Sequence, residues 1–246
     1  MSPIRRAFIY QDEKSHKFWT IDYSDIAIGV HYGKSGTIGK YEVKEYASLE
    51  ACEKEAKKLI ANKVKKGYKE AETFDFESCF YIDTVEYGPH PKTSHPRFVA
   101  HFTEDFYYDC GDEEAPFGSD EGSDTLSEVE EMIRKKRPIA FSTLPQYIVE
   151  QLWGMQYIAV TTLDKEEVEQ MKQKQEIDMQ QSDMVTYSSA FAQIKITGQL
   201  DPKLKNKALL ALKRFAIMYT ASAFTETQQT MYEGLLAFEA TVEESL

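Results

Sequence analysis

The sequence predicts an α+β protein in which an antiparallel sheet with one packed helix precedes a mixed domain with a helical C-terminal half. Three observations support this prediction: strand patterns in quick succession over the first 46 residues, one amphipathic helix after them, and long helical patterns towards the C-terminus. Apolar residues make up 42% of the chain and charged residues 28%, which excludes disorder throughout.

The first strand patterns are rich in β-branched and aromatic residues and alternate partly between apolar and polar. They cover residues 6–10, 17–23, 26–32 and 41–46. Residues 33–39 contain three glycines and predict a tight turn, because glycine adopts positive φ at little cost. An amphipathic helix is expected to begin after an N-cap at Ser48 and to end at Gly67.

Charge divides the chain into two predicted domains, residues 1–72 and residues 73–246. The first range holds 14 basic and 11 acidic residues, and the second holds 15 basic and 30 acidic residues. A change of sign along a chain suggests two units with different partners.

The second range predicts an acidic α+β domain. Strands are expected at residues 80–85, 97–102 and 155–161. Helices are expected at residues 125–136, 144–153, 164–193 and 202–221, and a capping box from Thr225 to Gln228 predicts a last helix reaching about residue 244.

Residues 104–131 hold twelve acidic residues and no basic one. Three interpretations stay open: a solvated loop, an interaction surface for a basic protein centred on Asp112, Glu113 and Glu114, or a site for a hard cation on Asp112, Asp120, Glu121 and Asp124. The spacing does not fit an EF-hand, and the histidines and cysteines match no standard zinc spacing, so we predict neither a metal nor a cofactor.

The chain also indicates its compartment. No apolar stretch reaches the roughly 20 residues that cross a bilayer, and no signal-peptide core follows the N-terminus. Three widely spaced cysteines, Cys52, Cys79 and Cys110, do not suit a disulfide framework. We therefore expect a cytoplasmic protein with no membrane partner, and the sequence leaves its oligomeric state open.

The N-terminal layout resembles the WGR domain. The resemblance rests on residues 17–21, on the run from Val30 to Lys40 with its Gly-Thr and later Gly, and on the helix ending in residues 65–68. Tyr32, Gly33 and Lys34 stand where the signature has Trp, Gly and Arg. The domain occurs in DNA-dependent poly(ADP-ribose) polymerases, where the triplet contacts DNA, and in small bacterial proteins of about this length. Their second domain has an acidic passage like residues 116–124.

The resemblance implies that Tyr32, Gly33 and Lys34 contact nucleic acid. Tyr offers a flat ring for stacking, whereas Lys keeps the charge of Arg without its two-pronged donor geometry. Lysines of the helix, Lys54, Lys57 and Lys58, form either a phosphate-binding face or simply a solvated one.

No sequence motif of a known hydrolase, kinase, nucleotide-binding or zinc enzyme is present. We therefore predict a non-enzymatic regulatory protein that binds DNA weakly and in a salt-sensitive manner. The alternative is an acidic module for a basic protein partner, and a metal-dependent enzyme ranks third.

Overall fold

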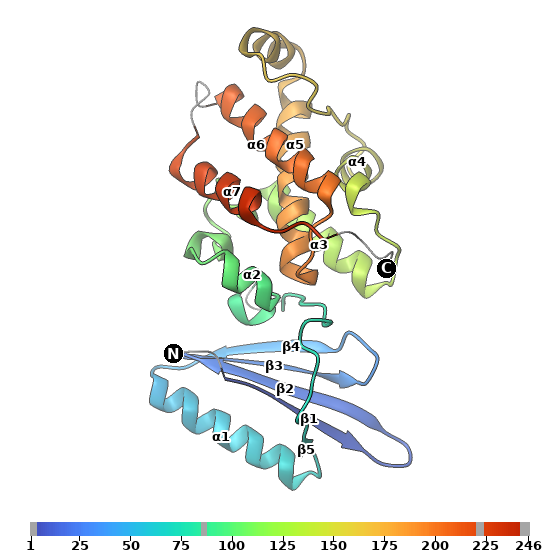
Figure 1. Ribbon diagram of the computed structural model, residues 1–246, viewed down its shortest axis with the longest axis vertical. Helices are drawn as coiled ribbons and strands as arrows, with labels where there is room; N and C mark the ends of the chain where they lie inside the picture. Colours follow the sequence, from blue (N-terminus) through green and yellow to red (C-terminus); the bar gives the residue numbers. More distant parts are fainter. Residues whose placement is uncertain (1–3, 85–87, 220–223, 242–246) are drawn as a thin grey trace. The chain divides into compact units, whose positions relative to one another are not determined.

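The computed structural model describes residues 4–84, 88–219 and 224–241, and it confirms the α+β class (Figure 1). The chain divides into two compact units, Met1–Ser94 and His95–Leu246, called unit 1 and unit 2 below.

Unit 1 is built on an antiparallel sheet with strand order β4-β3-β2-β1-β5. The strands are β1 (Ile4–Gln11), β2 (His16–Ser24), β3 (Ala27–Lys34), β4 (Lys40–Glu45) and the two-residue β5 (Lys69–Glu70). The first four confirm the predicted strands, whereas β5 was not predicted. Helix α1 (Leu49–Lys65) runs along one side of the sheet (Figure 1) and has Ser48 as its N-cap, as expected.

The core of unit 1 lies between the sheet and α1. Alternate residues of a strand point to the same face, so the side chains of Phe8, Trp19, Ile21 and Ile28 meet the helix together. The helix contributes Cys52, Ala56 and Ile60, which recur at four-residue steps and are buried.

Unit 1 extends further along the chain than the predicted domain of residues 1–72. The Tyr41 hydroxyl donates a hydrogen bond to the Phe80 carbonyl (2.9 Å), and the Lys92 ammonium reaches Asp22 (2.5 Å) and Ser24 (2.6 Å). These contacts hold the segment up to Ser94 against the strands. With this boundary, unit 1 has 15 basic and 15 acidic residues, so any positive surface on it must be local.

Unit 2 is almost entirely helical in its described part (Figure 1). Its longer helices are α3 (Asp120–Arg134), α5 (Lys165–Thr197), α6 (Pro202–Tyr219) and α7 (Glu226–Ala237). Shorter ones are α2 (Pro96–His101), α4 (Leu144–Tyr147), which continues into a π-helical turn at Ile148–Leu152, and two 3₁₀ turns at Asp105–Tyr108 and Phe141–Thr143. Among the described residues, no helix combines the length and the apolar character needed to span a membrane.

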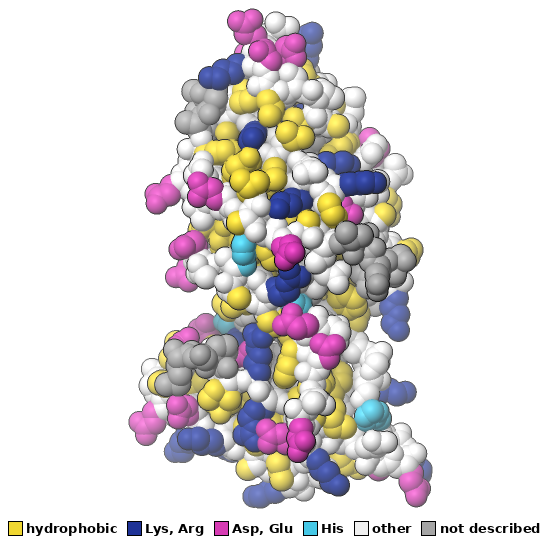
Figure 2. Space-filling view, viewed as in Figure 1, with side chains coloured by type: hydrophobic (Ala, Val, Ile, Leu, Met, Phe, Trp, Pro, Cys, Tyr) yellow, Lys and Arg dark blue, Asp and Glu magenta, His cyan; other side chains and the backbone are white. Residues whose placement is uncertain are grey.

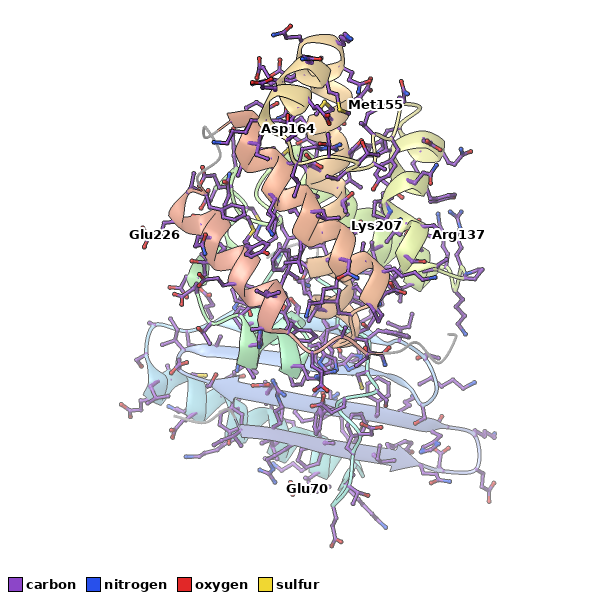
Figure 3. All side chains as sticks on the ribbon, turned by 45° about the horizontal axis from the view of Figure 1, so that its top comes forward. Glu70, Arg137, Met155, Asp164, Lys207 and Glu226 are labelled. Carbon is purple, nitrogen blue, oxygen red and sulfur yellow. The ribbon has the colours of Figure 1, made fainter. Side chains whose placement is uncertain are left out.

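The predicted helices of unit 2 are confirmed, with shifted ends. Helix α3 begins at Asp120, five residues before the predicted start, because Ser119 caps it. Helix α5 begins after its N-cap Asp164, labelled in Figure 3, and the Thr225–Gln228 capping box of α7 is present. Helix α7 ends at Ala237, short of the predicted end near residue 244, and residues 220–221 and 242–244 of the last two predicted helices fall outside the described residues.

The three strands predicted after residue 72 are wrong. Residues 97–101 form α2 because His95 caps the helix and Pro96 occupies its first turn. In residues 155–161 the backbone bonds side chains instead of a neighbouring strand: Ile158 N–H donates to Ser182 Oγ, and the carbonyls of Ile158 and Ala159 accept from Arg214. Residues 80–84 form no strand beyond an isolated bridge from Thr84 to Gly88.

Helix α5 forms the centre of unit 2. From Ser182 to Thr197 every residue is buried, because other helices pack around this half. The buried carboxylate of Asp183 accepts hydrogen bonds from the Arg214 guanidinium of α6, the shortest at 2.8 Å, which compensates both charges.

Candidate nucleic-acid interface

The sheet of unit 1 gathers lysines at the end where β3 meets the glycine-rich turn. The strand register sets Lys17 of β2 opposite Lys34 of β3, and it sets Trp19, Tyr32 and Lys40 side by side across β2, β3 and β4. Because side chains alternate between faces, Lys17, Lys34 and Lys40 all lie on the face that carries α1. We call these three residues the lysine trio.

The lysine trio is exposed, and none of its members forms an ion pair with the residues that the structure describes. By contrast, Arg6 on the same face donates two hydrogen bonds to Glu70, both 2.6 Å, at the β1–β5 edge of the sheet (Figure 3). Like charges directly opposite each other on neighbouring strands are destabilising. The Lys17–Lys34 pair therefore concentrates positive charge at this end of the sheet, where hydrogen bonds, and after them the charge of Lys17, lower the pKa of the Asp12 carboxyl.

The turn between β3 and β4 is held in one conformation. Gly39 has a φ of +77°, and a Cβ at this position would lie only 2.7 Å from the Tyr32 carbonyl oxygen. The His31 ring donates a hydrogen bond from Nε2 to the Ile38 carbonyl (2.5 Å) and stacks on Tyr41 with ring centroids 3.9 Å apart. Burial lowers the pKa of His31 to about 4, and the hydrogen bond to the Ile38 carbonyl opposes this change by raising the pKa.

Beside the trio, a groove of about 630 Å³ runs between β4 and α1. The Lys63 ammonium lies over three rings there, 5.1 Å from Trp19, 5.8 Å from Tyr32 and 5.1 Å from Tyr68. Such contacts are favourable cation–π interactions. Burial, and secondly the nearby Lys66, lower the pKa of Lys63.

Tyr32 forms part of the groove wall and is half-buried. Its hydroxyl donates to the Glu42 carboxylate (2.5 Å), and this hydrogen bond raises the pKa of Tyr32. The bond holds the ring in place, so Tyr32 presents a fixed aromatic surface next to several lysines. This combination suits the stacking and phosphate contacts of nucleic-acid recognition.

The structure brings together only half of the six residues predicted to bind nucleic acid. Tyr32, Gly33 and Lys34 are consecutive at the sheet end. Lys54 and Lys58 each lie two residues from the buried Ala56, hence about 200° around the helix axis, on its outer side.

Two of the helix lysines are also compensated by their own helix. Lys57 pairs with Glu53 (3.5 Å) and Lys58 with Glu55 (3.1 Å). Two lysines that join Tyr32 and Lys34 instead, Lys17 and Lys40, were missed from the sequence. The sequence held one indication for Lys17. A two-residue turn at Asp25 and Ile26 pairs residue 24 with residue 27, and counting outwards from the turn along both strands then pairs residue 17 with residue 34.

On the face shown in Figure 2, basic and acidic side chains are interspersed over the surface, with no extended region of one sign. This agrees with the equal numbers of basic and acidic residues in unit 1. The candidate interface is therefore a small local feature.

The predicted partner-binding residues lie just before α3 in unit 2. Asp112 accepts a hydrogen bond from the backbone of Glu114 (3.0 Å), and the Glu114 carboxylate accepts one from the Thr225 hydroxyl (2.7 Å). Glu113 is exposed. Two of the three carboxylates thus stabilise the local structure, and Glu113 is the most available to a partner.

The acidic passage 116–124 is mainly the start of α3. Ser119 Oγ accepts from the Gly122 backbone (3.0 Å), and a Cβ at Gly118 would lie 1.9 Å from the Asp112 carbonyl oxygen. The glycines are therefore required by close packing. Within the described parts of the chain, no three His, Cys, Asp or Glu side chains are grouped as metal ligands would be.

Comparison with known proteins identifies the domain at the N-terminus and a full-length relative. The model of the WGR domain matches residues 4–75. The chain is 45% identical over 240 residues to the uncharacterized protein YfeS of Escherichia coli K12, covering 96% of this chain and 98% of YfeS. It is also 48% identical over 65 residues to the E. coli protein YehF, and this match covers 26% of this chain and 24% of YehF. A crystal structure of a Bacteroides fragilis protein shares 50% identity over 28% of this chain and 19% of its own, with a TM-score of 0.27.

Proposed function

This chain belongs to the family of E. coli YfeS and carries a WGR domain at residues 4–75, and on that premise we propose that unit 1 binds DNA at the Tyr32 end of its sheet. The observation that carries the proposal is the lysine trio beside Tyr32. It combines three lysines on one face, without ion pairs among the described residues, with a fixed aromatic ring.

The trio suits a polyanion because its charges come from three neighbouring strands. Each lysine holds a compact ammonium on a flexible stem, so the three can follow successive phosphates without a precise fit. A phosphate between Lys17 and Lys34 would relieve the repulsion of these opposed side chains. The binding site therefore gains stability from the ligand that it is proposed to take.

Tyr32 and Lys63 supply the second element of the proposed site. Bases or sugars at an end or an interruption of a strand are free to stack on an aromatic ring, whereas those inside a continuous duplex are not. Lys63 already lies over the Tyr32 ring, so it can leave the ring for a phosphate when a base or sugar takes its place. We therefore propose a preference for DNA with a break or an end.

The affinity should be weak and sensitive to salt. Three lysine–phosphate contacts predict a slope of about −2.7 in log K against log salt, or a loss of roughly 40-fold between 50 and 200 mM. The proposal is one of binding, with no chemical step assigned to either unit.

The test is fluorescence anisotropy of the full chain with labelled nicked, blunt-ended and covalently closed hairpin duplexes at about 50 mM salt. We expect saturable binding, strongest for the nicked duplex, with the salt slope given above. Absence of saturable binding to every duplex at this salt concentration would remove the proposal. Equal binding to all three would remove only the preference for breaks.

A further inference from the structure

Unit 2 contains a cavity of about 450 Å³ between the start of α3 and helices α5, α6 and α7. Small-molecule sites in proteins typically occupy 300–1,000 Å³. The cavity lies within one compact unit and belongs to no feature used in the proposed DNA interface.

The cavity wall is apolar at depth. Met184 of α5, Leu212 of α6 and Met231 of α7 are all at least 95% buried and line it. Phe215 and the more exposed Tyr219 of α6 extend the wall outwards, with their rings 4.9 Å apart. This part suits the apolar body of a ligand.

One polar side chain in the wall has no partner. Tyr187 of α5 is 2% exposed and lines the cavity, and its hydroxyl forms no hydrogen bond with any residue in the described ranges. Buried tyrosine hydroxyls usually find a partner. Burial, and then the charges of Asp183, Glu121 and Glu114, raise the pKa of Tyr187.

The rim of the cavity is acidic. Among the described residues, four carboxylates line it, those of Glu113, Glu114, Asp120 and Glu121, and none of the lining side chains is basic. Thr225 donates a hydrogen bond to Glu114 and Gln181 donates one to Glu121 (2.8 Å). These neutral donors fix the two carboxylates without cancelling their charge. The N-terminus of α3 offsets only about half of one charge.

We propose that this cavity binds an organic cation, in which an ammonium group is carried on an apolar body. The body packs on the methionines, the ammonium lies among the rim carboxylates, and the Tyr187 oxygen accepts a hydrogen bond from it. A free amine and the lysine side chain of a partner protein share this chemistry.

The experiment uses the full chain with isotope-labelled methionine methyl groups. Phenethylammonium is titrated as the probe, and phenethyl alcohol serves as a neutral control of similar shape. We expect saturable shifts of the Met184 and Met231 methyl signals with the ammonium only, while Met155 and Met171, which do not line the cavity, stay unchanged. A blocked lysine amide and a short lysine-containing peptide are then compared with phenethylammonium to distinguish the two sources.

Variants test the parts of the site separately. The double change Glu113→Gln with Asp120→Asn removes two exposed rim charges and should weaken binding roughly three- to tenfold. Tyr187→Phe removes only the hydroxyl and should weaken it by a similar factor. A charge-matched control, Glu167→Gln with Glu169→Gln on the exposed side of α5, should change binding less than about twofold.

Three results would overturn the proposal. They are the absence of saturable shifts at Met184 and Met231 with all cationic probes, equal binding of the alcohol and the ammonium, or equal weakening by the rim variant and its control. A change of methyl signals throughout the free Tyr187→Phe variant would mark a folding defect, and the rim variant, whose residues are exposed, would then decide the question.

Discussion

The lysine trio of unit 1 and the acidic rim of the unit 2 cavity hold their charges in opposite ways. The trio projects from an open sheet face without ion pairs among the described residues, whereas carboxylates of the rim are fixed by hydrogen bonds around a concave site. An open row of flexible cations fits an extended polyanion, and a concave acidic rim fits a compact cation. The shape of the surface on which charged side chains lie therefore indicates the kind of partner better than the net charge of the domain does.

The largest expected effect is a difference in stability between a variant that breaks the buried ion pair of unit 2 and a variant that removes the exposed lysine trio of unit 1. Asp183→Leu leaves the Arg214 guanidinium buried without its carboxylate, so unfolding should require about 3–5 kcal/mol less free energy. Changing the trio to Gln should alter stability by less than about 0.5 kcal/mol. Urea unfolding of both variants measures the contrast, and the double change Asp183→Leu with Arg214→Met should recover part of the loss. Equal stability of the Asp183→Leu variant and the trio variant would contradict this distinction between buried and exposed charge.

The turn that positions Lys34 offers a matched pair of glycine changes. Gly39→Ala should destabilise unit 1 by about 2–3 kcal/mol, because positive φ is combined with a clash against the Tyr32 carbonyl. Gly36→Ala also has positive φ but meets nothing within 4 Å, so its cost should be only about 1 kcal/mol. DNA binding should fall with the first change and stay nearly constant with the second. The reverse order in thermal unfolding would show that the turn is not held as described.

His31 should make the stability of unit 1 depend on pH. The unfolded chain takes up a proton at His31 below about pH 6.5, whereas the folded protein does so only near pH 4. Stability is therefore full above the upper value and falls as pH is lowered towards 4, by about 3 kcal/mol in total. Urea unfolding followed by Trp fluorescence across this range measures the effect, and His31→Phe should flatten it. An unchanged pH dependence in that variant would assign the loss to other groups.

The smallest expected effect concerns the compensated lysines of α1. Replacing Glu53 and Glu55 by Gln frees Lys57 and Lys58 from pairs worth about 0.2–0.5 kcal/mol each. Because these lysines lie on the outer side of α1 or at its flank, DNA affinity should rise less than about threefold. A larger rise in anisotropy titrations would indicate that the outer helix face contacts DNA.

The fold of unit 1 was predictable because its elements are local. Alternating β-branched and aromatic residues predicted β1 to β4, and Ser48 with Gly67 predicted the limits of α1. One of the failures came where side chains replaced a strand as the backbone partner. Residues 155–161 include the β-branched Ile158, Val160 and Thr161, yet side chains distant in the sequence, those of Arg214 and Ser182, bond their backbone.

The candidate site was only partly predictable for a related reason. The motif indicated Tyr32, Gly33 and Lys34, but Lys17 and Lys40 join them through strand register, which depends on how several turns align the strands. The basic composition of α1 pointed to Lys54, Lys57 and Lys58. Composition does not show that Glu53 and Glu55 pair with two of them.

The most direct test of the DNA-binding account compares two triple variants of the full chain in anisotropy titrations with a nicked duplex. One changes Lys17, Lys34 and Lys40 to Gln, and the other changes Lys54, Lys57 and Lys58 to Gln, so both remove the same charge. We predict that the trio variant loses at least about tenfold in affinity and flattens the salt slope by about 2–3, while the helix variant loses less than about threefold. Equal losses, or a larger loss in the helix variant, would contradict the placement of the interface at the Tyr32 end of the sheet.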